Sequence, residues 1–290
     1  MTPRAATLIG LSAIVMWSLL AVMTVATGRI PAFQLLAMTF AIGAVAASAS
    51  WIGRPEAIRA LKQPLLAWAV GVGGLFGYHA LYFVALRLAP PAEAGLLNYL
   101  WPLLIVLLSS LLPGERLAPH HIIGAVLGLA GTVLLLAGKS SAAFEPAHGA
   151  GFVAAFVAAF VWAGYSVMSR KLKSVPTDAV AGFCLVTALL ALAVHLTFEV
   201  TIWPDSIGQW LAIAALGIGP VGAAFYAWDI GMKRGDIRVL GAASYATPLL
   251  STGFLIMAGF AAPSANIAVA AALIAGGGLI AAKDMIRKRI

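Results

Sequence analysis

Apolar runs recur along the whole chain, and this recurrence limits the possible folds more than any other feature. A helix needs about 20 apolar residues to cross a bilayer core of about 30 Å. Ten runs of this kind are separated by short loops rich in Pro, Gly and charge, at residues 7–26, 31–52, 64–86, 92–112, 119–138, 150–169, 178–199, 207–230, 237–259 and 264–282. The sequence therefore predicts an all-α membrane protein with ten transmembrane helices.

Composition agrees with a membrane protein. Hydrophobic residues make up 62% of the 290 residues, charged residues make up only 10%, and the mean hydropathy is +1.00. So few polar residues cannot cover the surface of a water-soluble globule of this size. Arg4 precedes the first apolar run as in a secretion signal, but that run is too long and lacks a clear small-x-small cleavage site. We interpret it as a first helix that stays in the protein.

The net charge of +8 is explained by membrane topology. With ten spans, Arg29, Arg87 and Lys139 lie on one side of the membrane and the other fifteen of the 18 Lys and Arg residues lie on the opposite side. Loops rich in Lys and Arg stay in the cytoplasm. We expect both termini in the cytoplasm and no nucleic-acid partner. The fifteen residues are Arg4, Arg54, Arg59, Lys62, Arg116, Arg170, Lys171, Lys173, Lys233, Arg234, Arg238, Lys283, Arg287, Lys288 and Arg289.

The chain contains an internal repeat at a spacing of 146 residues. The segment 96–104, LLNYLWPLL, corresponds to the segment 242–250, AASYATPLL, with Tyr, Pro, Leu and Leu in register. Arg87 falls on Lys233 at the same spacing. Two halves of five helices each are predicted.

An odd number of helices per half places the two copies in opposite orientations in the membrane. Such inverted repeats are typical of secondary transporters, in which the substrate site lies near the middle of the membrane between the copies. We predict a first copy at residues 1–138, an extracytoplasmic linker at residues 139–149, and a second, inverted copy at residues 150–290.

With ten spans in two copies, the chain resembles the drug/metabolite transporter superfamily over nearly its whole length. Residues 82–87 and 226–233, each followed by a helix of small residues with a central proline, are similar to its EamA-type repeat. The run 98–102, NYLWP, is similar to that of members that export aromatic amino acids, and the second copy departs from it at residues 244–248, SYATP. The resemblance implies a multi-pass exporter in a bacterial inner (plasma) membrane.

Two prolines inside predicted spans are expected to break their helices. Proline has no N–H, so Pro102 leaves the carbonyl of Asn98 without its helical partner, and Pro248 does the same for Ser244. A polar backbone group at membrane depth needs a partner in the protein or in a water-filled cavity. The freed carbonyls could bind a substrate ammonium group. Alternatively, the prolines are kinks that neighbouring helices and water satisfy.

Aromatic side chains are predicted to lie at matching depths in neighbouring spans. At a rise of about 1.5 Å per residue, His79 and Tyr99 lie about 10 Å below the outer membrane boundary and Trp101 about 14 Å below it. We expect a cavity lined by aromatic rings that can stack on an aromatic substrate, with helix packing as the alternative. The predicted substrate-binding residues are Trp17, Tyr78, His79, Tyr82, Asn98, Tyr99, Trp101, Trp162, Tyr226, Ser244 and Tyr245.

Ionisable groups inside spans are functional candidates, because burying a charge is costly. His79 is the best placed, since its imidazole can bind a carboxylate or change its protonation near neutral pH; a neutral His that bridges two helices is the alternative. His195 and Glu199 are expected to form a solvated pair at the outer end of a span. Asp229 and Lys233 are expected to form an i, i+4 pair at the cytoplasmic end without a role in transport.

The sequence therefore predicts a secondary transporter that exports amino acids, aromatic ones among them, by alternating access. No complete phosphate-binding loop and no HExxH zinc motif occur, so we expect no cofactor, no metal and no enzyme activity. The expected partners are amino acids and the lipid bilayer. Export of other small organic metabolites or cationic drugs is the closest alternative. A remote alternative is an intramembrane hydrolase, because Ser12 and Ser166 each follow a Gly by two residues.

Overall fold

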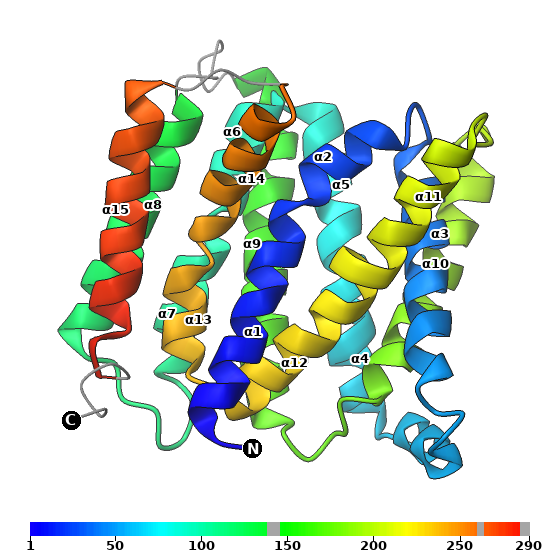
Figure 1. Cartoon of the computed structure of the whole chain (residues 1–290), viewed down its shortest axis with the longest axis horizontal. Helices are drawn as coiled ribbons and strands as arrows, with labels where there is room; N and C mark the ends of the chain where they lie inside the picture. Colours follow the sequence, from blue (N-terminus) through cyan, green and yellow to red (C-terminus); the bar gives the residue numbers. More distant parts are fainter. Residues whose placement is uncertain (138–145, 260–263, 285–290) are drawn as a thin grey trace.

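The structure, a computed structural model, consists of helices joined by loops and turns. It describes residues 1–137, 146–259 and 264–284, and no strand occurs among these residues. The long helices run side by side, and the start of α1 (Pro3–Ser18) lies at the same edge as the end of α15 (Ala265–Ala281; Figure 1). The prediction of an all-α chain is confirmed. Most of the predicted linker, residues 139–145, and the basic residues at 287–289 lie outside the described residues.

Apolar helices occupy each of the ten predicted runs. Among the described residues, eight helical segments are long and apolar enough to cross a membrane: Pro3–Ala26, Ala32–Ala49, Leu65–Leu88, Pro119–Leu136, Gly149–Lys171, Ala179–Phe198, Ile207–Arg234 and Ile237–Met257. The remaining two runs contain the shorter apolar helices Glu93–Ser109 and Ala265–Ala281. The chain is therefore a multi-pass membrane protein.

Five of these ten segments contain more than one helical element. Before residue 138 the elements are α1, α2 (Leu20–Ala26), α3 (Ala32–Ala49), η1 (Pro55–Leu61), α4 (Leu65–Val72), η2 (Gly73–Gly77), α5 (Tyr78–Leu88), α6 (Pro91–Asn98), α7 (Trp101–Ser109) and α8 (Pro119–Ala137). After residue 145 they are η3 (Pro146–His148), α9 (Gly149–Lys171), α10 (Ala179–Phe198), α11 (Ile207–Leu216), η4 (Gly217–Ala223), α12 (Ala224–Arg234), α13 (Ile237–Ala243), α14 (Ala246–Met257) and α15.

Two helices are interrupted next to the prolines singled out above. α6 ends at Asn98 and α7 begins at Trp101, while α13 ends at Ala243 and α14 begins at Ala246. Pro102 and Pro248 thus lie in the first turn of a restarted helix, where a missing N–H costs no hydrogen bond. Two other spans continue through the π-helical turns η2 and η4, a kind of turn frequent at functional sites.

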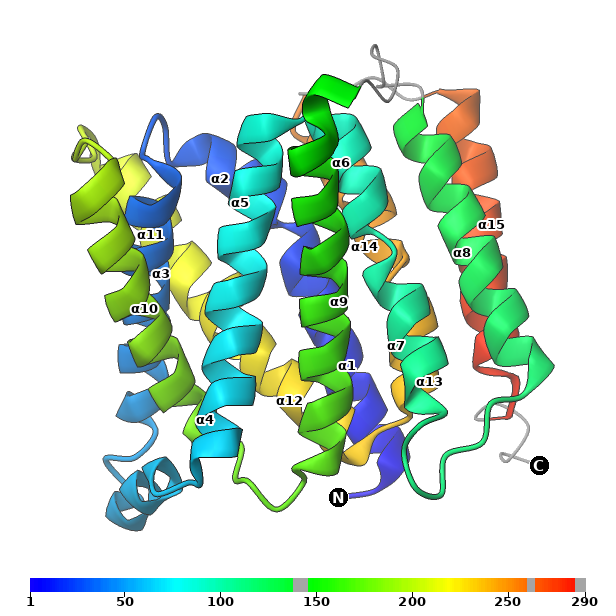
Figure 2. The same cartoon turned by 180° about the vertical axis from the view of Figure 1, so that it is seen from behind.

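The two halves of the chain pack helix against helix. The most extensive contacts are those of α8 with α15, α3 with α10, α1 with α12, and α5 with α9. Each pair joins a helix before residue 138 to one after residue 145. α8 and α15 form one end of the bundle and α3 and α10 the other (Figures 1 and 2). At the α8–α15 contact, a Cβ added to Gly124 would lie 2.5 Å from the carbonyl oxygen of Gly277, so only glycine allows this approach.

Candidate functional site

A cavity of about 670 Å³ lies inside the bundle. Ligand sites in proteins usually measure about 300–1,000 Å³. Its walls come from helices of both halves: α1 and α2, α3, α5, the α6–α7 break, α9, α12 and α14. It reaches Thr24 on α2 and Leu86 near the end of α5, at the edge of the bundle opposite the start of α1 (Figures 1 and 2). The cavity therefore approaches one edge of the bundle only.

Eight of the eleven predicted binding residues line this cavity: Trp17, Tyr78, His79, Tyr82, Asn98, Tyr99, Trp101 and Trp162. The other three, Tyr226, Ser244 and Tyr245, do not. The Tyr226 hydroxyl donates to the carbonyl of Asp178 at 3.3 Å, and the Ser244 hydroxyl donates to the carbonyl of Leu240 at 2.7 Å. These three residues belong to the half of the bundle that carries the start of α1, where the helices are in contact.

Indole rings form the floor of the cavity. The ring centroids of Trp17 and Trp162 are 5.5 Å apart, and those of Trp101 and Trp162 are 6.3 Å apart, both edge to face. The Trp17 Nε1–H donates to the carbonyl of Pro220 at 3.0 Å, which fixes this ring against η4. Edge-to-face contacts of this kind hold aromatic rings in place. The floor is therefore an ordered aromatic surface.

The imidazole of His79 is oriented by its own helix. Nδ1 lies 2.6 Å from the carbonyl oxygen of Leu75. Because a carbonyl oxygen only accepts, Nδ1 carries a proton, and Nε2 of the neutral ring is left as an acceptor for a group in the cavity. The ring also packs edge to face on Phe40, with centroids 5.3 Å apart. A neutral His79 can accept from a substrate ammonium, and a protonated His79 can donate to a carboxylate.

Tyr78 and Asn98 form a polar pair in the cavity wall. The Asn98 Nδ2–H donates to the Tyr78 hydroxyl at 3.0 Å, so the Tyr78 proton remains available to a ligand. The Asn98 Oδ1 atom is buried and has no hydrogen-bond partner. Tyr82 stacks on Tyr78 with ring centroids 6.0 Å apart. This wall offers a hydroxyl donor beside a stack of aromatic rings.

Carboxylates and fixed positive charges are absent from the described lining of the cavity. One charge cluster lies instead at the edge of the bundle opposite the start of α1 (Figure 1). Glu199 accepts from the backbone N–H groups of Phe33 and Gln34 at the start of α3, and pairs with Arg87 at 3.1 Å and with His195 at 3.0 Å. The expectation of a solvated His195–Glu199 pair was wrong, because both side chains are only 3% exposed. Glu199 is the cap of the α3 N-terminus.

The opposite edge, at the start of α1, is closed by Arg170. Its guanidinium donates to the carbonyls of Met232, Lys233 and Gly235 at the end of α12, at 2.9 to 3.3 Å. It also pairs with Glu115, which follows α7, at 2.5 Å. A single side chain therefore connects α9, α12 and the α7–α8 loop across the end of the bundle.

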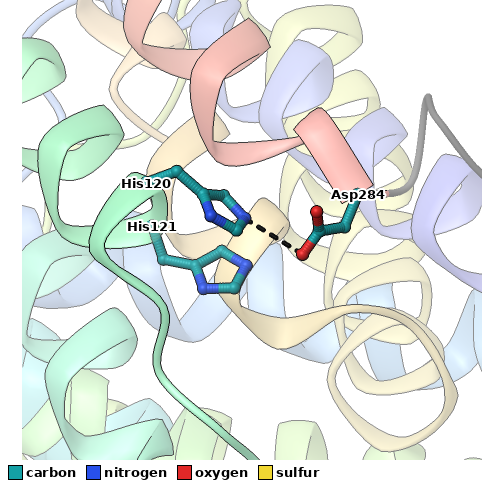
Figure 3. A group of neighbouring side chains, drawn as sticks. All are labelled: His120, His121 and Asp284. Atoms are coloured by element: carbon teal, nitrogen blue, oxygen red, sulfur yellow. Dashed lines mark ion pairs between the residues drawn. The ribbon is translucent and has the colours of Figure 1, made fainter.

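His120, His121 and Asp284 form the group of potential metal ligands found in the described part of the chain (Figure 3). His120 Nε2 lies 3.2 Å from an Asp284 oxygen. The Nδ1 atom of His121 accepts the backbone N–H of Ala118 at 3.1 Å, so the proton of its neutral ring is on Nε2. Only two ligand atoms remain free for a metal, whereas structural zinc sites use four. The group is better described as a link between the start of α8 and the end of α15.

Comparison with known proteins assigns the family. The EamA-like transporter family matches residues 4–137 and again residues 149–283. The chain is 55% identical to the aromatic amino acid exporter YddG of Ancylobacter novellus, over 97% of this chain and 98% of the relative. The chain belongs to the EamA-like transporter family. This confirms the resemblance to the drug/metabolite transporter superfamily.

Further comparisons support this EamA-family assignment. The aromatic amino acid exporter YddG of Salmonella typhimurium is 28% identical, over 87% of this chain and 88% of the relative. A solved crystal structure with 55% sequence identity has a TM-score of 0.93 and covers 97% of this chain and 98% of that one. The family is a transporter family, and the two YddG relatives are named as exporters.

The serines that suggested a hydrolase have structural partners in this EamA-family chain. The Ser166 hydroxyl donates to the carbonyl of Trp162 at 2.9 Å, accepts from the indole N–H of Trp228 at 3.0 Å, and is fully buried. The Ser12 hydroxyl donates to the carbonyl of Ile9. Within the described residues neither serine contacts a histidine, so neither has the base that a nucleophile requires.

Sequence reasoning missed two aromatic residues of α12. Phe225 lines the cavity, and its ring centroid lies 5.9 Å from that of Trp17. Trp228 is fully buried directly behind the floor, with its centroid 5.1 Å from that of Trp17. The two residues are three apart and thus on one helical face, and this spacing was the signal that could have identified them.

Proposed function

We propose that this protein is a secondary exporter of amino acids, including aromatic ones, that works by alternating access across the bacterial inner membrane. The observation that carries the proposal is the cavity, with its indole floor and with Tyr78, His79 and Asn98 in its wall. The rings provide stacking surfaces for an aromatic side chain. The polar groups provide a donor and an acceptor for the charged end of an amino acid.

The relatives support the same substrate class. Both YddG proteins named above are aromatic amino acid exporters by name. The lining of the cavity favours a zwitterion over a cationic drug, because its described residues include no carboxylate to neutralise an unpaired positive charge. A zwitterion carries its own counter-charge and needs only hydrogen-bond partners.

An inverted repeat accounts for the shape of the bundle. We assign residues 1–138 and 150–290 to two copies of five helices in opposite orientations, with residues 139–149 between them on the outer side of the membrane. The two separate matches to one family support two copies. The distribution of Lys and Arg supports cytoplasmic termini. With this orientation the large cavity is open to the outside, and the closed edge with Arg170 faces the cytoplasm.

Counterflow in proteoliposomes tests the function. Vesicles that contain the purified protein and are loaded with unlabelled tryptophan should accumulate labelled tryptophan or phenylalanine above the level of protein-free vesicles. Competition by unlabelled aliphatic amino acids then gives the substrate range. Accumulation no greater than in protein-free vesicles, for every amino acid, would contradict the proposal.

A further inference from the structure

An acid–base pair lies inside α12, below the floor of the large cavity. Asp229 and Lys233 are one helical turn apart, and the Lys233 Nζ lies 2.8 Å from the Asp229 carboxylate. Their side chains are 3% and 5% exposed, respectively. Burying two charges costs desolvation energy that their attraction hardly repays, so a buried pair of this kind contributes little net stability. The i, i+4 geometry agrees with the sequence expectation of a pair at the cytoplasmic end, and both side chains are buried.

The α9–α10 loop supplies one further hydrogen-bond partner to each member of the pair. The Thr177 hydroxyl donates to an Asp229 oxygen at 2.7 Å, and the Lys233 Nζ donates to the carbonyl of Val175 at 2.8 Å. These two contacts join α12 to the α9–α10 loop at the closed cytoplasmic edge. If this edge opens, Asp229 loses a donor and Lys233 loses an acceptor.

A small cavity borders the pair. Its volume is about 10 Å³, which is close to the least that one water molecule requires. Tyr165 lines this cavity together with Asp229 and Lys233, and its buried hydroxyl has no hydrogen-bond partner. The Tyr165 ring lies against Trp162 of the main cavity floor, with centroids 5.2 Å apart. A carboxylate, an ammonium and a hydroxyl therefore border one small space next to the floor of the main cavity.

The repeat spacing relates the surroundings of Asp229 to the wall of the large cavity. Residues 82 and 83 fall on residues 228 and 229 at a spacing of 146. Tyr82 and Phe83 line the large outer cavity, whereas Trp228 and Asp229 are buried. In an inverted repeat, the face of α12 with Trp228 and Asp229 becomes the wall of the cavity when the cytoplasmic side opens.

We infer that Asp229, Lys233 and Tyr165 form a second recognition site, which takes the zwitterionic end of an amino acid that enters from the cytoplasm. This inference rests on the proposed function and extends it to the first step of export. The substrate ammonium replaces Thr177 as the donor to Asp229, and the substrate carboxylate replaces the Val175 carbonyl as the acceptor from Lys233. The Tyr165 hydroxyl donates to the same carboxylate.

This exchange of partners links binding to opening. The substrate binds only after Thr177 and Val175 have moved away, so it stabilises the inward-open state and not the closed one. The ring of an aromatic substrate then lies toward Trp228, which occupies the position that Tyr82 has in the outer cavity. A substrate without the ammonium cannot replace Thr177 at Asp229, and a substrate without the carboxylate cannot replace Val175 at Lys233.

Face-specific transport kinetics test the inference. The full-length protein is reconstituted, and the KM for L-tryptophan is measured separately at the cytoplasmic and outer faces. Lys233→Met should raise the KM at the cytoplasmic face about tenfold, as expected for a lost hydrogen bond between charged groups, and change the KM at the outer face less than about twofold. Tryptamine, which has no carboxylate, should inhibit this variant and the wild type equally well from the cytoplasmic face.

The double variant Asp229→Asn with Lys233→Met tests the same point without leaving an unpaired buried charge. It should show a larger loss at the cytoplasmic face than Lys233→Met, because the charged partner of the substrate ammonium is removed as well, and it decides the test if the single variant folds poorly. Arg87→Met is the matched control, because Arg87 occupies the position equivalent to Lys233 at the outer end and pairs with Glu199. Its cytoplasmic KM should equal that of the wild type.

The experiment distinguishes failure of the proposed function from failure of the second recognition site. A wild type without saturable tryptophan transport would contradict the proposed function. A wild type that transports would contradict only the second site if the KM of the variants changes by one factor at both faces, or if Lys233→Met weakens tryptophan and tryptamine alike. The pair would then be a structural contact of the closed cytoplasmic edge.

Discussion

The hydroxyl of Tyr245 accepts a hydrogen bond from the backbone N–H of Leu103 at 3.2 Å. This contact joins a fully buried side chain at the α13–α14 break to the first turn of α7 in the other half. Tyr99, which falls on Tyr245 at the repeat spacing, instead lines the open cavity. The two tyrosines thus hold different positions in a bundle that is open on one side only.

Tyr245→Phe removes this contact and should favour the inward-open state. A hydrogen bond contributes about 0.5–1.5 kcal/mol net, so the population should shift between about twofold and about tenfold. The measurement is the labelling rate of Ser169→Cys, in a Cys184→Ala background, by a thiol reagent added from the cytoplasmic side. Tyr99→Phe is the control, because its hydroxyl does not bridge the halves in this state. Equal labelling rates in the two variants would exclude the Tyr245 contact as a determinant of closure.

His79→Ala should weaken transport of every amino acid, since His79 is assigned to the charged end that all of them share. The loss of a hydrogen bond to a charged group predicts a reduction in affinity of about tenfold or more. His79→Gln, which can place a polar atom near the Nε2 position, should recover part of this loss. The measurement is counterflow with tryptophan and with alanine, at matched amounts of monodisperse protein. A loss confined to aromatic substrates would assign His79 to ring contact instead.

The lowered pKa of Asp236 should make the stability of the folded protein depend on pH. Burial of its carboxyl opposes ionisation, but hydrogen bonds from Arg238, the positive charge of that residue, and the backbone N–H of Val239 outweigh it and hold the pKa of Asp236 below the ordinary value of 3.8. Because the folded pKa is the lower one, this stabilisation is complete above pH 3.8 and disappears as the pH falls through the folded pKa. Asp236→Asn should reduce the melting temperature in detergent at pH 7 and reduce its decline in acid. A variant curve parallel to that of the wild type would contradict this.

Membrane topology gives an independent prediction. Single cysteines introduced between residues 139 and 149, in a Cys184→Ala background, should react with an impermeant thiol reagent added from outside. Cysteines at Arg59 or Lys173 should react only from the cytoplasmic side, because these positions belong to the basic loops. Labelling of the 139–149 segment from the cytoplasm alone would reverse the orientation and, with it, the side to which the large cavity opens.

The sequence was sufficient to predict the helices and eight residues that line the cavity. Long apolar runs have few alternatives to membrane helices, since every backbone polar group in lipid must be paired within its own segment. Tyr78 and Tyr82 share a helical face, and the NYLWP run lies at the same depth, so these residues were predicted together and line one cavity. This prediction required only the local spacing of the residues and their depth below the ends of the predicted spans.

The closed half of the site could not be predicted in the same way. The repeat assigns Tyr99 and Tyr245 equal positions, but only one side of the bundle is open at a time, and a sequence does not specify which side. The Glu199 cap on α3 joins residues that are 166 positions apart. No local pattern indicates such a contact, because it depends on how α3 and α10 pack.

The most direct test of the account is counterflow by Trp101→Ala. Loss of one stacking contact of about 1 kcal/mol predicts roughly fivefold lower affinity for tryptophan and phenylalanine. Affinity for alanine, which has no ring to stack, should stay within about twofold of the wild-type value. Equal losses for aromatic and aliphatic amino acids in well-folded Trp101→Ala protein would contradict the account, because they would show that Trp101 packs the bundle and does not contact the substrate.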